Sequence, residues 1–239
     1  INTLQTESTY FESINGIAYL QENKLIKTIS RPVLTDLDNL PFPAWKFIQM
    51  KDYQRAWLQK SGYFSLNMTT TRGCPFKCNW CAKPIYGNRY NSRSPEKVVE
   101  EIDFLISNYQ VEHIWFCDDI FGLKPGWIKR FSELVVGKNL QFKFKIQCRA
   151  DLLLDDENIQ HLANAGCDEI WIGAESGSQK IIDAMDRRVK VGQVREMIQL
   201  AKKHGIQSGT FIMLGYPGET EEDIEDTIHH LKVSDPDLY

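Results

Sequence analysis

The chain of 239 residues has no hydrophobic run near the ~20 residues that a membrane-spanning helix needs. Its first residues, Ile1-Asn2-Thr3, include neither a starting Met nor the basic and apolar segments of a secretory signal. Positive charge is not in excess, because 28 Lys and Arg against 32 Asp and Glu give a net charge of −4. We therefore expect a cytoplasmic protein, cut from a longer chain, that binds neither a membrane surface nor a long nucleic acid.

The six cysteines are too few and too unevenly placed for a disulfide framework. Three of them lie within eight residues, whereas Cys117, Cys148 and Cys167 are far apart. A cysteine cluster in a chain without a secretion signal indicates a metal site in a reducing compartment. Cys117 and Cys148 lie in strand-like apolar runs, where a thiol usually serves as a small hydrophobic side chain.

Residues 1–60 differ in character from the rest of the chain. Residues 17–28 predict a short hairpin around a polar turn, and residues 31–45 are too rich in proline for a helix or a central strand. We interpret residues 1–60 as a hairpin and connector that form the tail of an absent upstream domain. Residues 61–239 are then the core domain.

Strand-like and helix-like segments alternate from residue 64 onward. The strands are expected at residues 64–71, 113–118, 142–148, 169–174 and 207–214. The amphipathic segments between them carry helix-start signals, namely Ser94 before Pro95, Asp155, and Thr220 with Asp223 three residues later. This order predicts a parallel sheet with right-handed crossovers.

The strand at residues 142–149 distinguishes a barrel from an open sheet. Its sequence, FKFKIQCR, alternates apolar residues with Lys, Lys, Gln and Arg, so one face of the strand is polar. A central strand of a doubly wound sheet is apolar on both faces instead. We predict an α/β fold, a partial (β/α)6 TIM-like barrel with polar groups in its lumen. Because the chain stops at residues 235–239, we expect this barrel to be truncated at its last strand.

The motif that carries chemistry is CPFKCNWC, from Cys74 to Cys81. Its C-x3-C-x2-C spacing lies in the loop after the first strand, at the edge where barrel active sites are found. Thiolates bind iron–sulfur clusters and zinc. A closed zinc site needs a fourth ligand, and neither a second C-x2-C nor a suitably placed His supplies one. The spacing therefore favours a cluster with one open iron, and zinc or three unligated thiols are the alternatives.

This motif, with Trp80 before its last cysteine, resembles the signature of the radical S-adenosylmethionine (SAM) superfamily, and the resemblance covers residues 64–239. It implies a 4Fe–4S cluster held by Cys74, Cys78 and Cys81, with SAM chelating the open iron and Trp80 beside the cofactors. It also implies reductive cleavage of SAM to methionine and a 5′-deoxyadenosyl radical. The implied partners are a small-molecule substrate and a reducing electron donor such as a flavodoxin or ferredoxin.

The same resemblance implies that residues at other strand ends contact SAM. Asp118 and Asp119 stand where the family contacts the methionyl ammonium, although the usual motif there is Gly-Gly-Glu and an acidic helix cap is the alternative. Arg149 pairs either with the SAM carboxylate or with Glu175 across the lumen. Glu175 is expected at the ribose hydroxyls, or else stabilises a loop, and Gly215 is expected near the adenine.

A more specific resemblance concerns the connector. Residues 36–45, DLDNLPFPAW, resemble the segment that joins a cobalamin-binding domain to the barrel in cobalamin-binding radical SAM proteins. No cobalamin motif of the type D-x-H-x2-G occurs in the chain, so cobalamin is expected to be bound by a domain outside it. The implied chemistry is methylation or ring formation on an unidentified substrate. The alternatives are a tRNA methylthiotransferase-like enzyme and a non-catalytic zinc-binding module.

Overall fold

The structure, a computed structural model, describes residues 11–82 and 86–239. The chain divides into two compact units, Ile1–Thr35 and Asp36–Tyr239. The predicted cysteine motif and all the predicted parallel strands belong to the second unit.

The first unit is built on an antiparallel hairpin of β1 (Ala18–Gln21) and β2 (Lys24–Lys27). Glu22 and Asn23 form its two-residue turn with positive φ angles of 49° and 62°, a conformation that matches the twist of the two strands. A short 3-10 helix, η1 (Phe11–Ser13), precedes the hairpin. The hairpin predicted from the sequence is therefore present.

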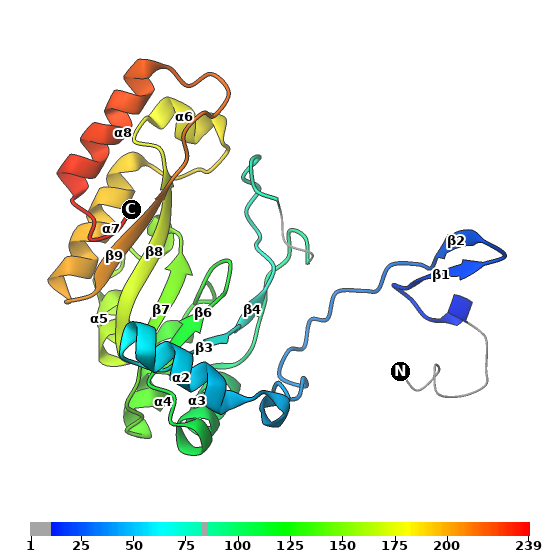
Figure 1. The fold of residues 1–239 in the computed structure, drawn as a ribbon. Coiled ribbons are helices and arrows are strands. Elements are labelled where there is room, and N and C mark those ends of the chain that lie inside the picture. Colours follow the sequence, from blue (N-terminus) through cyan, green and yellow to red (C-terminus); the bar gives the residue numbers. More distant parts are fainter. Residues whose placement is uncertain (1–10, 83–85) are drawn as a thin grey trace. The chain divides into compact units, whose positions relative to one another are not determined.

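The second unit contains one five-stranded parallel sheet, and its strands are neighbours in the order in which the chain makes them (Figure 1). These strands are β3 (Ser65–Met68), β6 (His113–Phe116), β7 (Lys143–Cys148), β8 (Cys167–Glu175) and β9 (Gln207–Ile212). Each new strand adds at the same edge, so the sheet curls in one direction as a barrel does. Beyond β9, Leu238 forms a parallel bridge with Gly209, where the next strand was expected. The predicted partial (β/α)6 barrel is confirmed.

Helices alternate with these strands. Each helix packs against the next along the sheet, in the order α3 (Pro95–Tyr109), α4 (Trp127–Gly137), α5 (Asp156–Asn164), α7 (Val191–Lys203) and α8 (Glu221–Ser234). The predicted caps are present, since Ser94 Oγ accepts from the Lys97 amide at 3.2 Å. None of the helices in the described residues is both long enough and apolar enough to cross a bilayer.

The two faces of the sheet have different compositions. The face that packs on the helices is fully buried and apolar, with Ile114, Phe144, Ile146, Ile170 and Ile172 in its centre. The other face is partly or fully accessible and carries polar and aromatic side chains, among them Asn67, Trp115, Lys145, Glu169 and Trp171. The alternation seen in the sequence of β7 thus separates the core from a functional lumen.

The proline-rich connector packs on the barrel. Asp38 accepts a hydrogen bond from the Ser94 amide at 2.8 Å, and the buried indole of Trp45 donates to the Glu101 carboxylate at 3.1 Å. From Asp36 onward the connector therefore belongs to the second unit, although the sequence grouped it with the hairpin. A 3-10 turn, η2 (Trp45–Phe47), leads into α2 (Met50–Ser61), a helix that the sequence did not indicate. No residue of α2 is buried, so it lacks a strong apolar stripe.

Candidate active site

The cysteine loop is closed at its base by a small antiparallel ribbon. Its strands are β4 (Thr71–Arg72) and β5 (Asn91–Ser92), and Arg72 lies opposite Asn91. Gly73 has a φ of +85°, and a Cβ at that position would lie 2.1 Å from the Arg89 carbonyl oxygen. Glycine is therefore required where the chain turns from the ribbon toward the first cysteine.

The tip of the loop is held by a second part of the barrel. Asn79, between the second and third cysteines, donates its backbone amide to the Met185 carbonyl and its side-chain amide to the Ala184 carbonyl, the latter at 2.7 Å. The Tyr216 hydroxyl donates to the Asn79 side chain at 2.8 Å and lies 3.0 Å from the same Ala184 carbonyl. The loop is thus anchored to the end of α6 (Gln179–Ala184) and to the segment after β9.

One pocket collects most of the predicted site residues. It lies at the carboxyl ends of the strands, and the predicted residues that line it are Cys74, Cys78, Trp80, Cys81, Asp119, Arg149 and Glu175. These residues come from the cysteine loop and from the ends of β6, β7 and β8. Asp118 and Gly215 do not line it. The structure therefore brings the cysteines together with three of the ionic groups that the family resemblance assigned to SAM.

The side chain of Asp118 bonds to the neighbouring backbone and does not face the pocket. Its side chain is buried, with Oδ1 accepting from the Thr70 and Thr71 amides at 2.7 and 2.9 Å and Oδ2 from the Thr70 hydroxyl at 2.5 Å. Burial raises the pKa of this carboxyl to about 6, although the hydrogen bonds oppose the shift. Asp118 fixes the strand end from which the cysteine loop departs. The adjacent Asp119 is the one that reaches the pocket, and burial raises its pKa as well.

Gly215 lies outside the pocket in an exposed turn. Its φ is +82°, and its amide donates to the Glu219 carboxylate at 2.5 Å. The glycine therefore closes a loop that also carries Tyr216, the residue that holds the cysteine loop. The structure shows this turn bracing the tip of the cysteine loop through Tyr216, and its place near the adenine stays a prediction.

Glu175 forms a buried ion pair with Arg187, a residue that no sequence signal indicated. Arg187 donates to Glu175 Oε1 at 3.0 Å and to the Gly173 carbonyl at 2.6 Å. Glu175 itself has a φ of +63°, which is rare for a residue other than glycine, and the register between β8 and β9 shifts just before it. Burial raises the pKa of Glu175, and the charge of Arg187 opposes this. The bend directs the carboxylate into the pocket.

Arg149 pairs with Asp151 rather than with Glu175. Its Nε and Nη2 donate to the two carboxylate oxygens of Asp151 at 3.0 and 3.1 Å, and Nη2 also donates to the Arg187 carbonyl at 2.7 Å. Glu175 is paired with Arg187, so the pairing of Arg149 with Glu175 is absent. Arg149 instead faces the cysteine loop, with Nη1 4.0 Å from Cys78 Sγ.

The donor set suits an iron–sulfur cluster. The three thiols line one pocket, and none of the described residues lining it is a histidine. Burial raises the pKa of the Cys74 thiol, and the nearby Asp119 and the other two cysteines raise it further. A bound iron would instead lower the pKa of the thiol, because a metal ion favours the thiolate. Within residues 11–82 and 86–239 no three ligand groups already form a metal site, so the fit rests on the donor types and their shared pocket.

An aromatic pair forms the lumen wall beside the cysteines. The rings of Trp171 and Phe211, from β8 and β9, have centroids 4.7 Å apart, and both line the pocket. The Trp171 indole donates to the Glu169 carboxylate at 2.5 Å. A Cβ on Gly209 would lie 2.4 Å from this indole, so the glycine provides the space in which the ring lies. The two rings give this part of the pocket an apolar wall.

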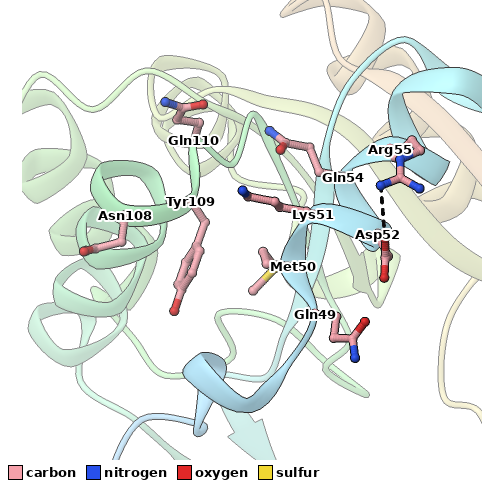
Figure 2. Close-up of a pocket in the computed structure, with 9 residues that line it drawn as sticks. All are labelled: Gln49, Met50, Lys51, Asp52, Gln54, Arg55, Asn108, Tyr109 and Gln110. Atoms are coloured by element: carbon pink, nitrogen blue, oxygen red, sulfur yellow. Dashed lines mark ion pairs between the residues drawn. The ribbon is translucent and has the colours of Figure 1, made fainter.

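A second pocket lies at the opposite edge of the sheet, where α3 ends just before β6 begins. Figure 2 shows Met50 and Tyr109 facing its interior, surrounded by polar side chains of α2 and of the end of α3. Its ion pair, Arg55 with Asp52 at 3.3 Å, is exposed. This pocket contains no thiol or histidine among its lining residues, and nothing in it matches the chemistry of the cysteine loop.

The sequence comparisons agree with the site. The sequence model of the Radical SAM superfamily matches residues 68–231, which is more than half of the chain. The chain belongs to the radical SAM superfamily. Membership of this family implies the use of a 4Fe–4S cluster and SAM, the cofactors that the resemblance of the cysteine motif predicted.

Several curated proteins resemble this radical SAM chain along nearly its whole length. An uncharacterized methyltransferase of Pyrococcus horikoshii is 28% identical over 228 residues, 95% of this chain and 48% of that protein. The anaerobic magnesium-protoporphyrin IX monomethyl ester cyclase of Rubrivivax gelatinosus is 27% identical over 232 residues, 94% of this chain and 40% of that protein. The tRNA-2-methylthio-N(6)-dimethylallyladenosine synthase of Clostridium botulinum is 28% identical, but over only 69% of this chain and 38% of its own.

The fold of this radical SAM chain also occurs in a solved structure. The methyltransferase TsrM from Kitasatospora setae, determined with cobalamin and a [4Fe-4S] cluster bound, superposes with a TM-score of 0.78 at 18% identity. The match covers 98% of this chain and 47% of TsrM. The radical SAM chain thus spans less than half the length of TsrM and of these three curated relatives.

Proposed function

We propose that this chain is the catalytic core of a radical SAM enzyme in which Cys74, Cys78 and Cys81 hold a 4Fe–4S cluster. The observation that carries the proposal is that these thiols share one pocket with Asp119 and Glu175. When bound, the cluster supplies the electron that cleaves a sulfonium C–S bond of SAM, which yields methionine and a 5′-deoxyadenosyl radical. That the protein is cytoplasmic, and that its electron donor is a flavodoxin or a ferredoxin, stay predictions.

The residues of the pocket divide the binding of SAM between them. Asp119 is the anion available for the methionyl ammonium, and a cation beside it offsets the burial that raises its pKa. Glu175 is directed into the pocket, with Arg187 balancing its charge, so its carboxylate can accept hydrogen bonds from ribose hydroxyls. Trp80 lines the same pocket and shields it on the loop side.

The substrate side of the pocket is formed by Trp171 and Phe211. Their two rings favour a small molecule with a flat or apolar part, because aromatic side chains supply large apolar contact areas. Glu169 orients the indole and so fixes this surface. We propose that the substrate lies against this wall, with the carbon or ring that reacts turned toward SAM.

We further propose that the whole protein uses cobalamin, held by a domain outside this chain, for methylation or ring closure. The connector from Asp36 packs on the barrel through Asp38 and Trp45, as a segment that positions an upstream domain should. Support also comes from the names of its relatives, a methyltransferase and a cyclase, which match both the connector and the barrel. The methylthiotransferase alternative has less support, because that relative matches a smaller part of the chain.

Anaerobic SAM cleavage tests the proposed core function. The protein reconstituted with iron and sulfide should carry about four irons per chain and, with dithionite, convert SAM to 5′-deoxyadenosine and methionine. Cys78→Ala should lose both the cluster and the cleavage. Cys117→Ala is the matched control, since Cys117 does not line the pocket, and should keep both. Stoichiometric zinc without a cluster in the native protein would contradict the proposal.

Cobalt analysis tests the cobalamin proposal separately. The whole protein, produced in cells supplied with cobalamin, should carry cobalt in addition to iron. A protein that holds the cluster and cleaves SAM, yet takes up no cobalt, would leave the core function standing and remove the cobalamin branch. Labelled methyl groups from SAM should then be followed into product to separate methylation from ring closure.

A further inference from the structure

We propose that Arg149 is a positioning residue that holds the Cys78 corner of the cysteine loop and raises the reduction potential of the cluster through its charge. The inference rests on the proposed cluster site and goes beyond it, because it assigns a specific electronic role to a residue outside the cysteine motif. It also differs from the SAM-carboxylate role that the family resemblance suggested for Arg149.

The guanidinium group of Arg149 lies against two residues of the cysteine motif. Its central carbon is 3.8 Å from the centroid of the Phe76 ring, in cation–π contact. Its Nη1 points at Cys78 Sγ, 4.0 Å away, which is the long limit of a hydrogen bond to sulfur. One cation therefore contacts the ring that precedes Cys78 in the loop and the thiol of Cys78 itself.

The remaining donors of Arg149 are already occupied. Asp151 accepts from Nε and Nη2, and the Arg187 carbonyl accepts from Nη2 at 2.7 Å. These bonds fix the plane of the guanidinium, and only 6% of its side chain is exposed. Nη1 is therefore the donor nitrogen that is left to face the pocket, and it points at the sulfur of Cys78. A bidentate pair with a ligand carboxylate would first require the break of the pair with Asp151.

The effect of Arg149 on the reduction potential of the cluster follows from the positive charge of its guanidinium group. Reduction adds one negative charge to the cluster, and a fixed cation nearby stabilises the reduced state more than the oxidised state. Cluster potentials respond to net charge and to hydrogen bonds on the sulfur atoms, and Arg149 supplies a positive charge and a donor directed at Cys78 Sγ. Arginine keeps its charge at any accessible pH. The carboxylate of Asp151 acts in the opposite direction, because it partly cancels that charge.

Potentiometric titration followed by EPR of the reduced cluster tests this role. In Arg149→Gln the midpoint potential should fall by at least about 59 mV, which is a tenfold lower ratio of reduced to oxidised cluster at the same potential. Arg149→Lys keeps the charge and should stay nearer to the wild type. Asp151→Asn should shift the potential upward. Arg188→Gln is the matched control, because Arg188 pairs with Asp186 two residues away, as Arg149 does with Asp151, but on the surface.

The outcomes are distinct. Arg149→Gln with full iron content and an unchanged potential would overturn the inference, and so would an equal fall in Arg149→Lys, since charge would then not be the cause. If Arg149→Gln does not hold the cluster, Asp151→Asn decides: an upward shift supports the inference, and an unchanged or lower potential overturns it. Failure of the wild-type protein to bind any cluster would instead overturn the proposed function.

Discussion

Glu175 and Arg187 form their buried ion pair in a space that exists only because residue 173 has no side chain. A Cβ on Gly173 would lie 2.2 Å from Glu175 Oε1 and 2.8 Å from Arg187 Nη2. Each of the two charged side chains is less than a tenth exposed, so neither can avoid a clash with residue 173 by turning into solvent while it stays in the pocket. The shape of the pocket thus depends on Gly173 as much as on the acidic residues that line it.

Gly173→Ala should displace this pair and weaken the binding of SAM. Overpacking of a well-filled site typically costs about 1–3 kcal/mol. We expect SAM to bind at least about tenfold more weakly, equivalent to ~1.4 kcal/mol, with the iron content unchanged. Equilibrium binding of SAM to the cluster-loaded protein measures this. Gly192→Ala is the matched control, since a Cβ there meets nothing within 4 Å. Equal affinity in both variants would show that the pair does not shape the SAM site.

Asp118 should make the unfolding free energy of the protein depend on pH. Burial raises its pKa to about 6 from the ordinary 3.8, so the native state holds the proton more tightly than the unfolded state. The carboxyl therefore favours folding most below about pH 4, and this contribution is lost as the pH rises toward 6. The expected loss is roughly 3 kcal/mol, from about two pKa units.

Asp118→Asn should remove that part of the pH dependence. The Asn oxygen can accept from the Thr70 and Thr71 amides as Oδ1 does, and its amide can donate to the Thr70 hydroxyl. Urea unfolding of the two proteins between about pH 4 and pH 6.5 compares the slopes. Asp118→Ala, which has no acceptor for the two amides, should be less stable at every pH. Parallel slopes for the wild type and Asp118→Asn would show that Asp118 does not titrate in this range.

Tyr216→Phe should loosen the tip of the cysteine loop. It removes the hydroxyl that bonds to Asn79 and lies against the Ala184 carbonyl, and a hydrogen bond of this kind contributes about 1 kcal/mol. We expect several-fold faster loss of iron to a chelator, with the overall unfolding midpoint little changed. The control is Tyr53→Phe, because Tyr53 is exposed on α2. The same rate of iron loss in both variants would indicate that this brace does not hold the loop.

The cluster loop and the barrel could be predicted from the sequence because both depend on local patterns. The spacing from Cys74 to Cys81 defines the donor set without any knowledge of the fold. The alternation of apolar and polar residues in β7 shows which face of the strand is buried. The caps at Ser94 and Thr220 show where the helices that follow them begin. Strand order then followed from the alternation of strands and helices, since crossovers of this kind are right-handed.

Contacts between distant residues could not be predicted in this way. Asn79 is 105 residues from Ala184 and 137 from Tyr216, and no periodic pattern connects them. Nor could the sequence decide between Asp118 and Asp119, because neighbouring residues at a strand end point in opposite directions and the register alone determines which is buried. The helix α2 was missed because it lacks the buried stripe on which the prediction of helices relies.

The ribbon of β4 and β5 has a consequence for how this domain can diversify. Arg72 and Asn91 face each other, so the chain departs from the sheet and returns to it at one place. An insertion or deletion between Cys81 and Gly87 would leave the cysteine spacing, the contacts of Asn79 and the register of the parallel strands unchanged. That part of the loop can therefore vary in length between related domains while the three cysteines and the supporting barrel stay the same.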